Sequence, residues 1–142
     1  MEKRVFSNEL IPLVKELLED GQDVMLTVSG NSMRPFYHHH KTVVKLRYPK
    51  ENLQKYDVIL YQVHNQYKLH RIYEVHEDVY IVYGDALTDR EIISKVQVFG
   101  VVISHTEKKK TIEKDNKNYL FKVRMWALLK PFRRLLLRLF GG

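Results

Sequence analysis

One turn of eight residues decides how this sequence is interpreted: Val28-Ser29-Gly30-Asn31-Ser32-Met33-Arg34-Pro35. It follows an apolar run and precedes an irregular polar loop. A serine on a glycine-containing turn presents its hydroxyl outward and leaves its backbone N–H available to a developing oxyanion, as acyl transfer requires. Ordinary turns also contain serine, glycine and asparagine, so the turn taken alone leaves a purely structural role open.

The chain around this turn is predicted to be mainly β, with a helix at each end. Apolar residues at helical spacing after Ser7, an N-cap candidate, predict a helix that ends at Gly21. We divide the chain into an N-terminal helix (1–23), a β domain (24–105), a polar linker (106–117) and a basic amphipathic helical tail (118–142). The β-rich runs that predict strands are Val24–Val28, Thr42–Leu46, Val58–Val63, Tyr67–Val75, Val79–Tyr83 and Val96–Ser104.

Several sequence boxes resemble, in order, those of one superfamily. Residues 29–35, Ser-Gly-Asn-Ser-Met-Arg-Pro, resemble the nucleophile box of type I signal peptidases and of the related self-cleaving phage and SOS-response repressors, which are serine peptidases of the S24/S26 type. Residues 56–61 are similar to a following strand, 69–72 to the general-base box, 84–89 to the Gly-Asp box and 98–102 to the closing strand. The resemblance covers about residues 24–103 and implies the signal-peptidase and SOS-repressor β fold.

The resemblance implies that Ser32 is the nucleophile and His70 the general base. Most bacterial signal peptidases and the repressors place a lysine where His70 stands, whereas the endoplasmic-reticulum, archaeal and sporulation-associated enzymes place a histidine there. An imidazole with an ordinary pKa near 6.5 suits proton abstraction at neutral pH. Lys68 remains an alternative base, because residues 68 and 70 point to the same face of a strand.

A histidine base needs a carboxylate that fixes its tautomer and stabilises the imidazolium. In the histidine-type relatives the orienting aspartate closes the box that begins with Gly-Asp, which makes Asp89 the first candidate here and Asp85 the second. The Ser32 N–H is one expected oxyanion donor. The neighbours expected to complete the oxyanion hole or to touch the substrate are Gly30, Asn31 and Met33.

No metal or cofactor is expected. The absence of cysteine excludes disulfides, thiol nucleophiles and cysteine metal sites. The run His38-His39-His40 has no carboxylate within seven residues, and its side chains alternate in direction, so we expect a polar loop beside the nucleophile. The sequence shows neither a secretion signal nor an apolar run of about 18–20 residues, which predicts a cytoplasmic protein, with the inner face of the membrane as an option.

The positive charge of the chain is confined to its end. Residues 1–105 carry 13 Lys or Arg against 14 Asp or Glu, whereas residues 106–142 carry 11 against 3. Leucines gather on one side of 131–140 and arginines on the other, which is typical of a helix that lies on an anionic membrane. We expect Tyr119–Phe140 to bind such a surface; an acidic protein partner, nucleic acid, or packing against the core are the alternatives.

The sequence thus predicts a serine endopeptidase that cleaves a peptide or leader segment through an acyl-enzyme on Ser32. The substrate would add as an extended strand beside the site. The alternative is a non-catalytic peptide-binding or regulatory module on the same fold, docked by its basic tail. A repressor-type DNA-binding protein would need a helix-turn-helix, and a single helix precedes the β region.

Overall fold

A computed structural model of the chain describes residues 2–4 and 10–140. The N-terminal helix is α1, Ile11–Glu19, and the predicted N-cap, Ser7, lies outside the described residues. Ile11, Val14 and Leu18 form the buried face of α1, at the spacing that the sequence pattern predicts. The chain leaves the helix through Gly21, whose φ of +88° is a backbone conformation that glycine adopts without steric cost.

The fold is mainly β, as predicted. The described strands form one sheet in the order β1-β2-β3-β8-β4-β5-β6-β7, with β9 paired to β8. Neighbouring strands are antiparallel except β1 and β2. The strands are β1 Glu2–Arg4, β2 Val24–Thr27, β3 Val43–Arg47, β4 Val58–Val63, β5 Gln66–Val75, β6 Val79–Tyr83, β7 Glu91–Ser94, β8 Val98–Glu107 and β9 Lys110–Glu113.

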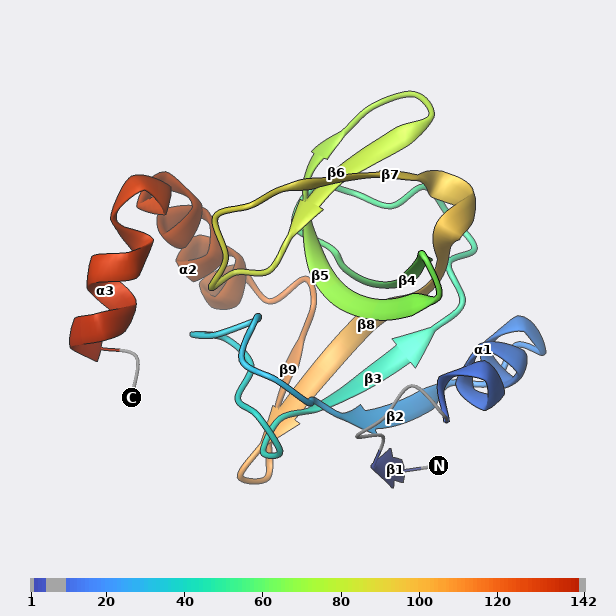
Figure 1. The fold of residues 1–142 in the computed structure, drawn as a ribbon. Helices are drawn as coiled ribbons and strands as arrows, with labels where there is room; N and C mark the ends of the chain where they lie inside the picture. Colours follow the sequence, from blue (N-terminus) through green and yellow to red (C-terminus); the bar gives the residue numbers. More distant parts are fainter. Residues whose placement is uncertain (1, 5–9, 141–142) are drawn as a thin grey trace.

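The curled sheet of Figure 1 encloses two apolar cores, and β4 contributes to both. Val58 and Leu60 pack into the core that α1 covers, whereas Ile59 and Tyr61 face the core between β4, β5, β6 and β7. This division follows from the period of two along a strand, which sends successive side chains to opposite faces. Tyr61 is therefore directed toward β7, which matters for the site below.

The segment described above as a polar linker, residues 106–117, holds regular structure. Strand β8 continues to Glu107, turns at Lys108 and Lys109, both with positive φ, and returns as β9. Strands β1 and β7 are further additions, and β7 is followed by the short 3₁₀ helix η1, Lys95–Gln97, so β8 begins at Val98 rather than Val96. The added strands are three or four residues long and show little apolar alternation, which is why the sequence pattern does not predict them.

The first part of the tail is docked on the β domain. Helix α2, Lys117–Leu128, is capped by the Asn116 side chain and buries Tyr119, Val123 and Trp126. The 3₁₀ helix η2, Lys130–Phe132, and helix α3, Arg133–Phe140, follow it. Figure 1 shows α2 and α3 at the opposite end of the molecule from α1. Over the residues that the structure describes, no helix is long and apolar enough to cross a membrane.

Candidate active site

One cavity of about 270 Å³ brings the predicted nucleophile and both candidate bases together. Ser32, from the turn after β2, and Lys68 and His70, from β5, all line it. Its remaining walls are mainly aliphatic side chains: Ile11, Leu26, Val28, Val44, Leu60 and Leu69. Thr27 also lines this cavity, and its buried hydroxyl makes no hydrogen bond within the described chain.

The Ser32 turn is held by the segment Gly84-Asp85-Ala86. The Ala86 N–H donates to the Ser32 carbonyl oxygen at 2.9 Å. A Cβ atom at Gly84 would collide with that same carbonyl oxygen and would lie 3.0 Å from the Ser32 Cβ. Position 84 therefore requires glycine because the two backbones approach too closely for any side chain.

The expected oxyanion donors differ in whether their N–H groups already have an acceptor in the structure. Gly30, with φ of +94°, donates its N–H to His39 Nδ1 at 2.6 Å, so this N–H already has an acceptor. The N–H groups of Ser32 and Met33 donate to no acceptor among the described residues. Asn31 is exposed, and the Met33 side chain is buried in the core. Two successive backbone N–H groups at the nucleophile are the best-placed oxyanion donors.

A hydrogen-bond chain lies behind His70. Its Nδ1 is 3.0 Å from the Tyr61 hydroxyl oxygen, and the Tyr61 hydroxyl donates to Glu91 Oε1 at 2.7 Å. An ionised carboxylate only accepts hydrogen bonds, so the Tyr61 proton points to Glu91 and its oxygen accepts from His70 Nδ1–H. This assignment leaves His70 Nε2 unprotonated and able to act as a base.

The electrostatics agree with this protonation pattern. Burial raises the pKa of Glu91, but hydrogen bonds from Tyr61 and Lys68 outweigh it and hold this pKa below its ordinary value. Burial, together with the charge of Lys68, lowers the pKa of His70 to about 4. His70 is therefore neutral at physiological pH, as a general base must be before the reaction.

The two candidate bases differ in their partners. Lys68 Nζ lies 3.2 Å from Glu91 Oε2 and 3.5 Å from Oε1, so the ammonium is engaged in an ion pair. His70 forms its hydrogen bond through Nδ1, and its Nε2 has no hydrogen-bond partner within the described chain. No hydrogen bond joins Ser32 to either base among these residues.

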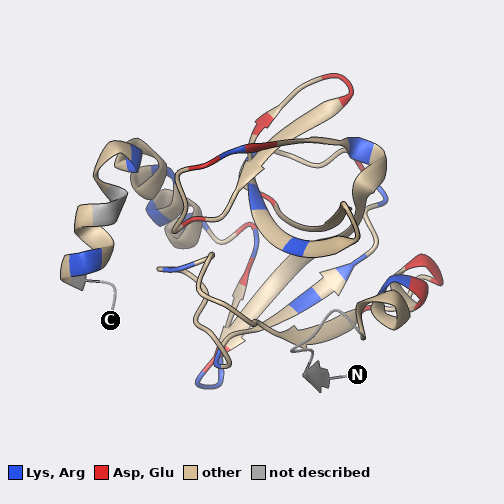
Figure 2. Cartoon of the chain, viewed as in Figure 1, with Lys and Arg blue, Asp and Glu red and all other residues tan. Residues whose placement is uncertain are grey.

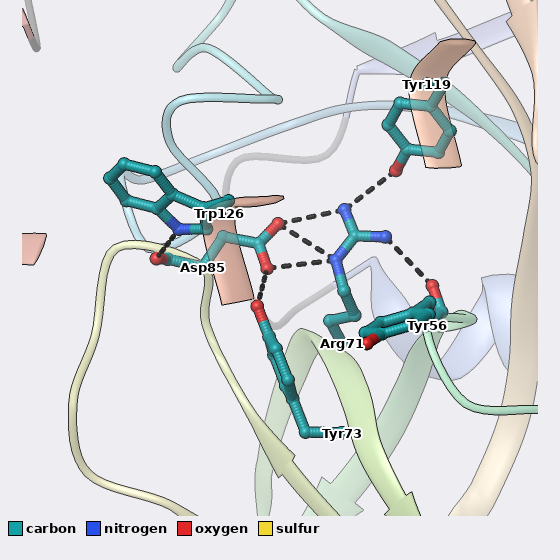
Figure 3. A network of polar contacts seen from close by, with 6 residues as sticks. All are labelled: Tyr56, Arg71, Tyr73, Asp85, Tyr119 and Trp126. Atoms are coloured by element: carbon teal, nitrogen blue, oxygen red, sulfur yellow. Dashed lines mark hydrogen bonds and ion pairs between the residues drawn. The ribbon is translucent and has the colours of Figure 1, made fainter. Parts of the chain in front are cut away.

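Neither predicted orienting aspartate contacts His70. Asp85 is fully buried and accepts hydrogen bonds from Arg71 Nε and Nη2, both at 2.9 Å, and from the Tyr73 hydroxyl at 2.6 Å (Figure 3). Asp89 is exposed on the loop before β7. The structure therefore does not bring either aspartate to His70, and the groups behind His70 Nδ1 are Tyr61 and Glu91.

The buried ion pair of Arg71 and Asp85 links four parts of the fold. Arg71 also donates to the Tyr56 carbonyl oxygen at 2.9 Å and to the Tyr119 hydroxyl oxygen at 2.7 Å, while Trp126 donates to the Asp85 carbonyl oxygen at 2.6 Å (Figure 3). Burial alone would lower the pKa of Arg71, but the Asp85 charge holds it above its ordinary value. The network fixes β5, α2, the Gly84 segment and the turn at Tyr56 relative to one another.

A comparison with known families identifies this arrangement. The profile described as peptidase S24-like matches residues 2–103. The chain belongs to the peptidase S24-like family. No curated protein matches the chain significantly. The match to the S24-like domain includes every residue that lines the cavity and ends before α2, so Tyr119 and Trp126 reach the buried network of this domain from outside the matched region.

Two residues of the candidate site, Tyr61 and Glu91, are not predicted from the sequence. Tyr61 stands in a strand of aliphatic neighbours, and a buried tyrosine normally finds a hydrogen-bond partner, so its hydroxyl was a signal that could have been followed. Glu91 begins β7, which the sequence pattern did not reveal. Its place behind His70 depends on how three strands pair, and no local motif encodes that.

Proposed function

We propose that this S24-like protein is a serine endopeptidase of the signal-peptidase-like type, with Ser32 as nucleophile and His70 as general base. One observation carries the proposal: Ser32 and His70 line the same cavity, and the chain from His70 through Tyr61 to Glu91 leaves His70 Nε2 free to accept a proton. The ion pair of Lys68 with Glu91 makes Lys68 the weaker candidate for the base.

The chemistry follows from these positions. Ser32 Oγ forms a bond to the scissile carbonyl carbon while its proton passes to His70 Nε2, and the carbonyl electron pair moves onto the oxygen. The Ser32 and Met33 N–H groups, which have no acceptor within the described chain, donate to that oxyanion and stabilise it. His70 then gives the proton to the leaving amine as the C–N bond breaks. Water hydrolyses the resulting ester by the same route and restores Ser32.

The walls of the cavity favour an extended peptide with an apolar side chain at the cleaved position. Aliphatic side chains such as Leu26, Val44 and Leu60 line its volume of about 270 Å³. The Thr27 hydroxyl is buried without a described partner, so a polar backbone group of a bound peptide would satisfy it. A leader segment presented as a strand fits these features.

A peptide library tests the proposal. The full chain is incubated with a proteome-derived peptide mixture, and new termini are identified by mass spectrometry. We expect cleavage by the wild type, none by Ser32→Ala, a severe loss in His70→Ala and a residual activity in Lys68→Met. Trapping of an acyl group on Ser32 at short times would support the covalent step.

The outcomes separate the candidate functions. Cleavage by Ser32→Ala would exclude the proposed nucleophile, and loss of activity in Lys68→Met with activity retained in His70→Ala would make Lys68 the base. Peptides that are retained by the folded wild type and never cut would indicate the non-catalytic peptide-binding module instead.

A further inference from the structure

The outward face of the C-terminal helices is apolar. Seven large apolar residues here have 37% to 75% of their surface exposed, on α2, in the connection to α3 and on α3 itself. We propose that this face binds the surface of an anionic lipid membrane, in a role that does not depend on the peptidase proposal. We call it the helical face; its residues are Phe121, Met125, Leu128, Leu129, Phe132, Leu135 and Leu139.

The helical face is held in a defined orientation by the opposite side of α2. Tyr119, Val123 and Trp126 recur at helical spacing and are buried against the β domain. Tyr119 and Trp126 are hydrogen-bonded into the Arg71 and Asp85 network, so α2 is part of the domain rather than a loosely attached segment. The exposed apolar residues of α2 therefore remain in water in the isolated chain, together with those that follow on η2 and α3, and so many large exposed apolar side chains are unusual.

The charges around this patch are of one sign. Residues 116–142 hold seven Lys or Arg and no Asp or Glu. Figure 2 shows basic positions on α2 and α3 and no acidic ones, whereas acidic positions lie on α1 and on the β5–β6 side of the sheet. Lys122 and Arg124 are exposed on α2, and Arg138 is exposed on α3. Apolar residues interleaved with cations match the boundary between acyl chains and anionic headgroups.

A cavity beside α2 adds a second feature that suits lipid. It has a volume of about 580 Å³ and lies between α2, β9 and the loop that follows Ser32. Phe121, Met125 and Leu129 of the helical face line it, and Lys110 and Lys122 stand among its lining residues. An apolar hollow with ammonium groups beside it can hold the part of an acyl chain nearest the headgroup, while the phosphate of the same lipid pairs with the lysines.

A membrane explains these observations better than the other partners. Nucleic acid would pair with the cations but would leave the exposed leucines in water. An acidic protein would need an apolar groove ringed by carboxylates to match both the leucines and the cations, whereas an anionic lipid surface offers both features without a fitted shape. The exposed leucines and phenylalanines of α2 and α3 can enter a lipid interface together with the cavity beside them.

The location of the helical face relates it to the active site. Pro35 and Phe36, which line the cavity beside α2, belong to the same turn as Ser32. Phe36 also packs edge-on against Tyr119 of α2, with ring centroids 5.7 Å apart. Binding of the helical face would hold the nucleophile turn close to the membrane surface, where a membrane-associated peptide could reach it.

Vesicle flotation with the full chain tests the proposal. Vesicles of phosphatidylcholine alone are compared with vesicles that also contain phosphatidylglycerol. We expect flotation with the anionic vesicles, weak flotation with the neutral ones, and a decrease as salt is raised. Lys122→Gln removes one surface charge and should weaken partitioning about fivefold. Phe121→Ser with Leu128→Ser should weaken it at least about tenfold.

Matched variants control for composition. Val96→Ser removes a side chain that is 91% exposed on η1, and Lys50→Gln removes an exposed lysine from the loop between β3 and β4; neither should change flotation. Absence of flotation with anionic vesicles at low salt would overturn the proposal, and so would equal effects of the helical-face and control variants. Equal binding to neutral and anionic vesicles would exclude the electrostatic part. The readout is binding, so it is unaffected if the protein proves not to be a peptidase.

Discussion

Replacement of Glu91 by glutamine is the sharpest test of the proposed chemistry. Glu91 lies behind Tyr61 and His70, and the substitution keeps the size of the side chain while removing its charge. When His70 accepts the Ser32 proton, the imidazolium carries a positive charge that the Glu91 carboxylate stabilises. Glu91→Gln should therefore slow the step in which this charge develops, with little change in KM.

The size of the effect follows from the geometry. The bonds of 3.0 and 2.7 Å place the carboxylate oxygen within about 6 Å of His70 Nδ1. At an effective dielectric constant of about 20, two unit charges at that separation attract by about 3 kcal/mol. The Lys68 ammonium, 3.2 Å from the same carboxylate, cancels part of this attraction. A net loss of about 1–2 kcal/mol remains, which corresponds to a fall in kcat of about 5- to 30-fold.

The assay combines kinetics on a cleaved peptide with ¹⁵N NMR of the imidazole. The wild type should show His70 protonated at Nδ1, and Tyr61→Phe should remove this preference. Glu74→Gln is the control, because Glu74 lies on β5 like His70 but forms a surface ion pair with Arg90 and a hydrogen bond with His76. If Glu91→Gln and Glu74→Gln have the same kcat and the tautomer is unchanged in Tyr61→Phe, the chain behind His70 has no positioning role.

Three further predictions follow from the buried groups. Asp85→Asn leaves a guanidinium buried without its counter-charge and should lower the free energy of unfolding by about 3–5 kcal/mol, whereas the exposed Asp89→Asn should change it by less than about 0.5 kcal/mol; urea denaturation measures both. Gly84→Ala should displace the nucleophile turn and abolish cleavage while lowering the urea midpoint only in part. A wild-type kcat in this variant would contradict the close approach of Gly84 to the Ser32 backbone. The pKa values of His70 and His105 are both lowered to about 4, so the unfolded chain binds more protons below pH 6.5 and stability should fall from about pH 6.5 toward pH 4; an equal urea midpoint at about pH 7.5 and about pH 5 would refute this.

Short runs of β-branched and aromatic residues allowed most of the sheet to be predicted from the sequence. Val58–Val63 and Val79–Tyr83 are strands with the predicted bounds, because β-branched and aromatic residues fill both faces of buried strands. The sequence pattern predicts a linker where the hairpin at Lys108 and Lys109 lies, because its strand β9 is short and polar. Hydrogen bonds to β8 and a turn with positive φ form it, and neither leaves a hydrophobic pattern.

The candidate site was predictable only where a contiguous motif encodes it. The residues around Ser32 and those around His70 each lie in one short stretch of sequence. The groups behind His70 do not: Tyr61 reaches His70 through the pairing of β4 with β5, and Glu91 reaches Tyr61 from β7. Asp85 and Asp89 are the candidates that the order of boxes in the family resemblance implies. The buried guanidinium of Arg71 is the stronger partner for Asp85, since an unpaired charge there would be costly.

The C-terminal helices cannot be removed as a separate membrane module. The Tyr119 hydroxyl accepts a hydrogen bond from buried Arg71, and Trp126 donates one to the buried carbonyl oxygen of Asp85. Asp85 belongs to the segment that holds Ser32 in place. A chain truncated after residue 117 would leave the Arg71 N–H and the Asp85 carbonyl oxygen without these partners, at about 1–3 kcal/mol each, and should lose stability and cleavage together with vesicle binding. Loss of flotation after truncation therefore says nothing about the helical face. Only substitutions on its outward side, such as Leu128→Ser, separate membrane binding from the integrity of the site, and they should leave the urea midpoint unchanged.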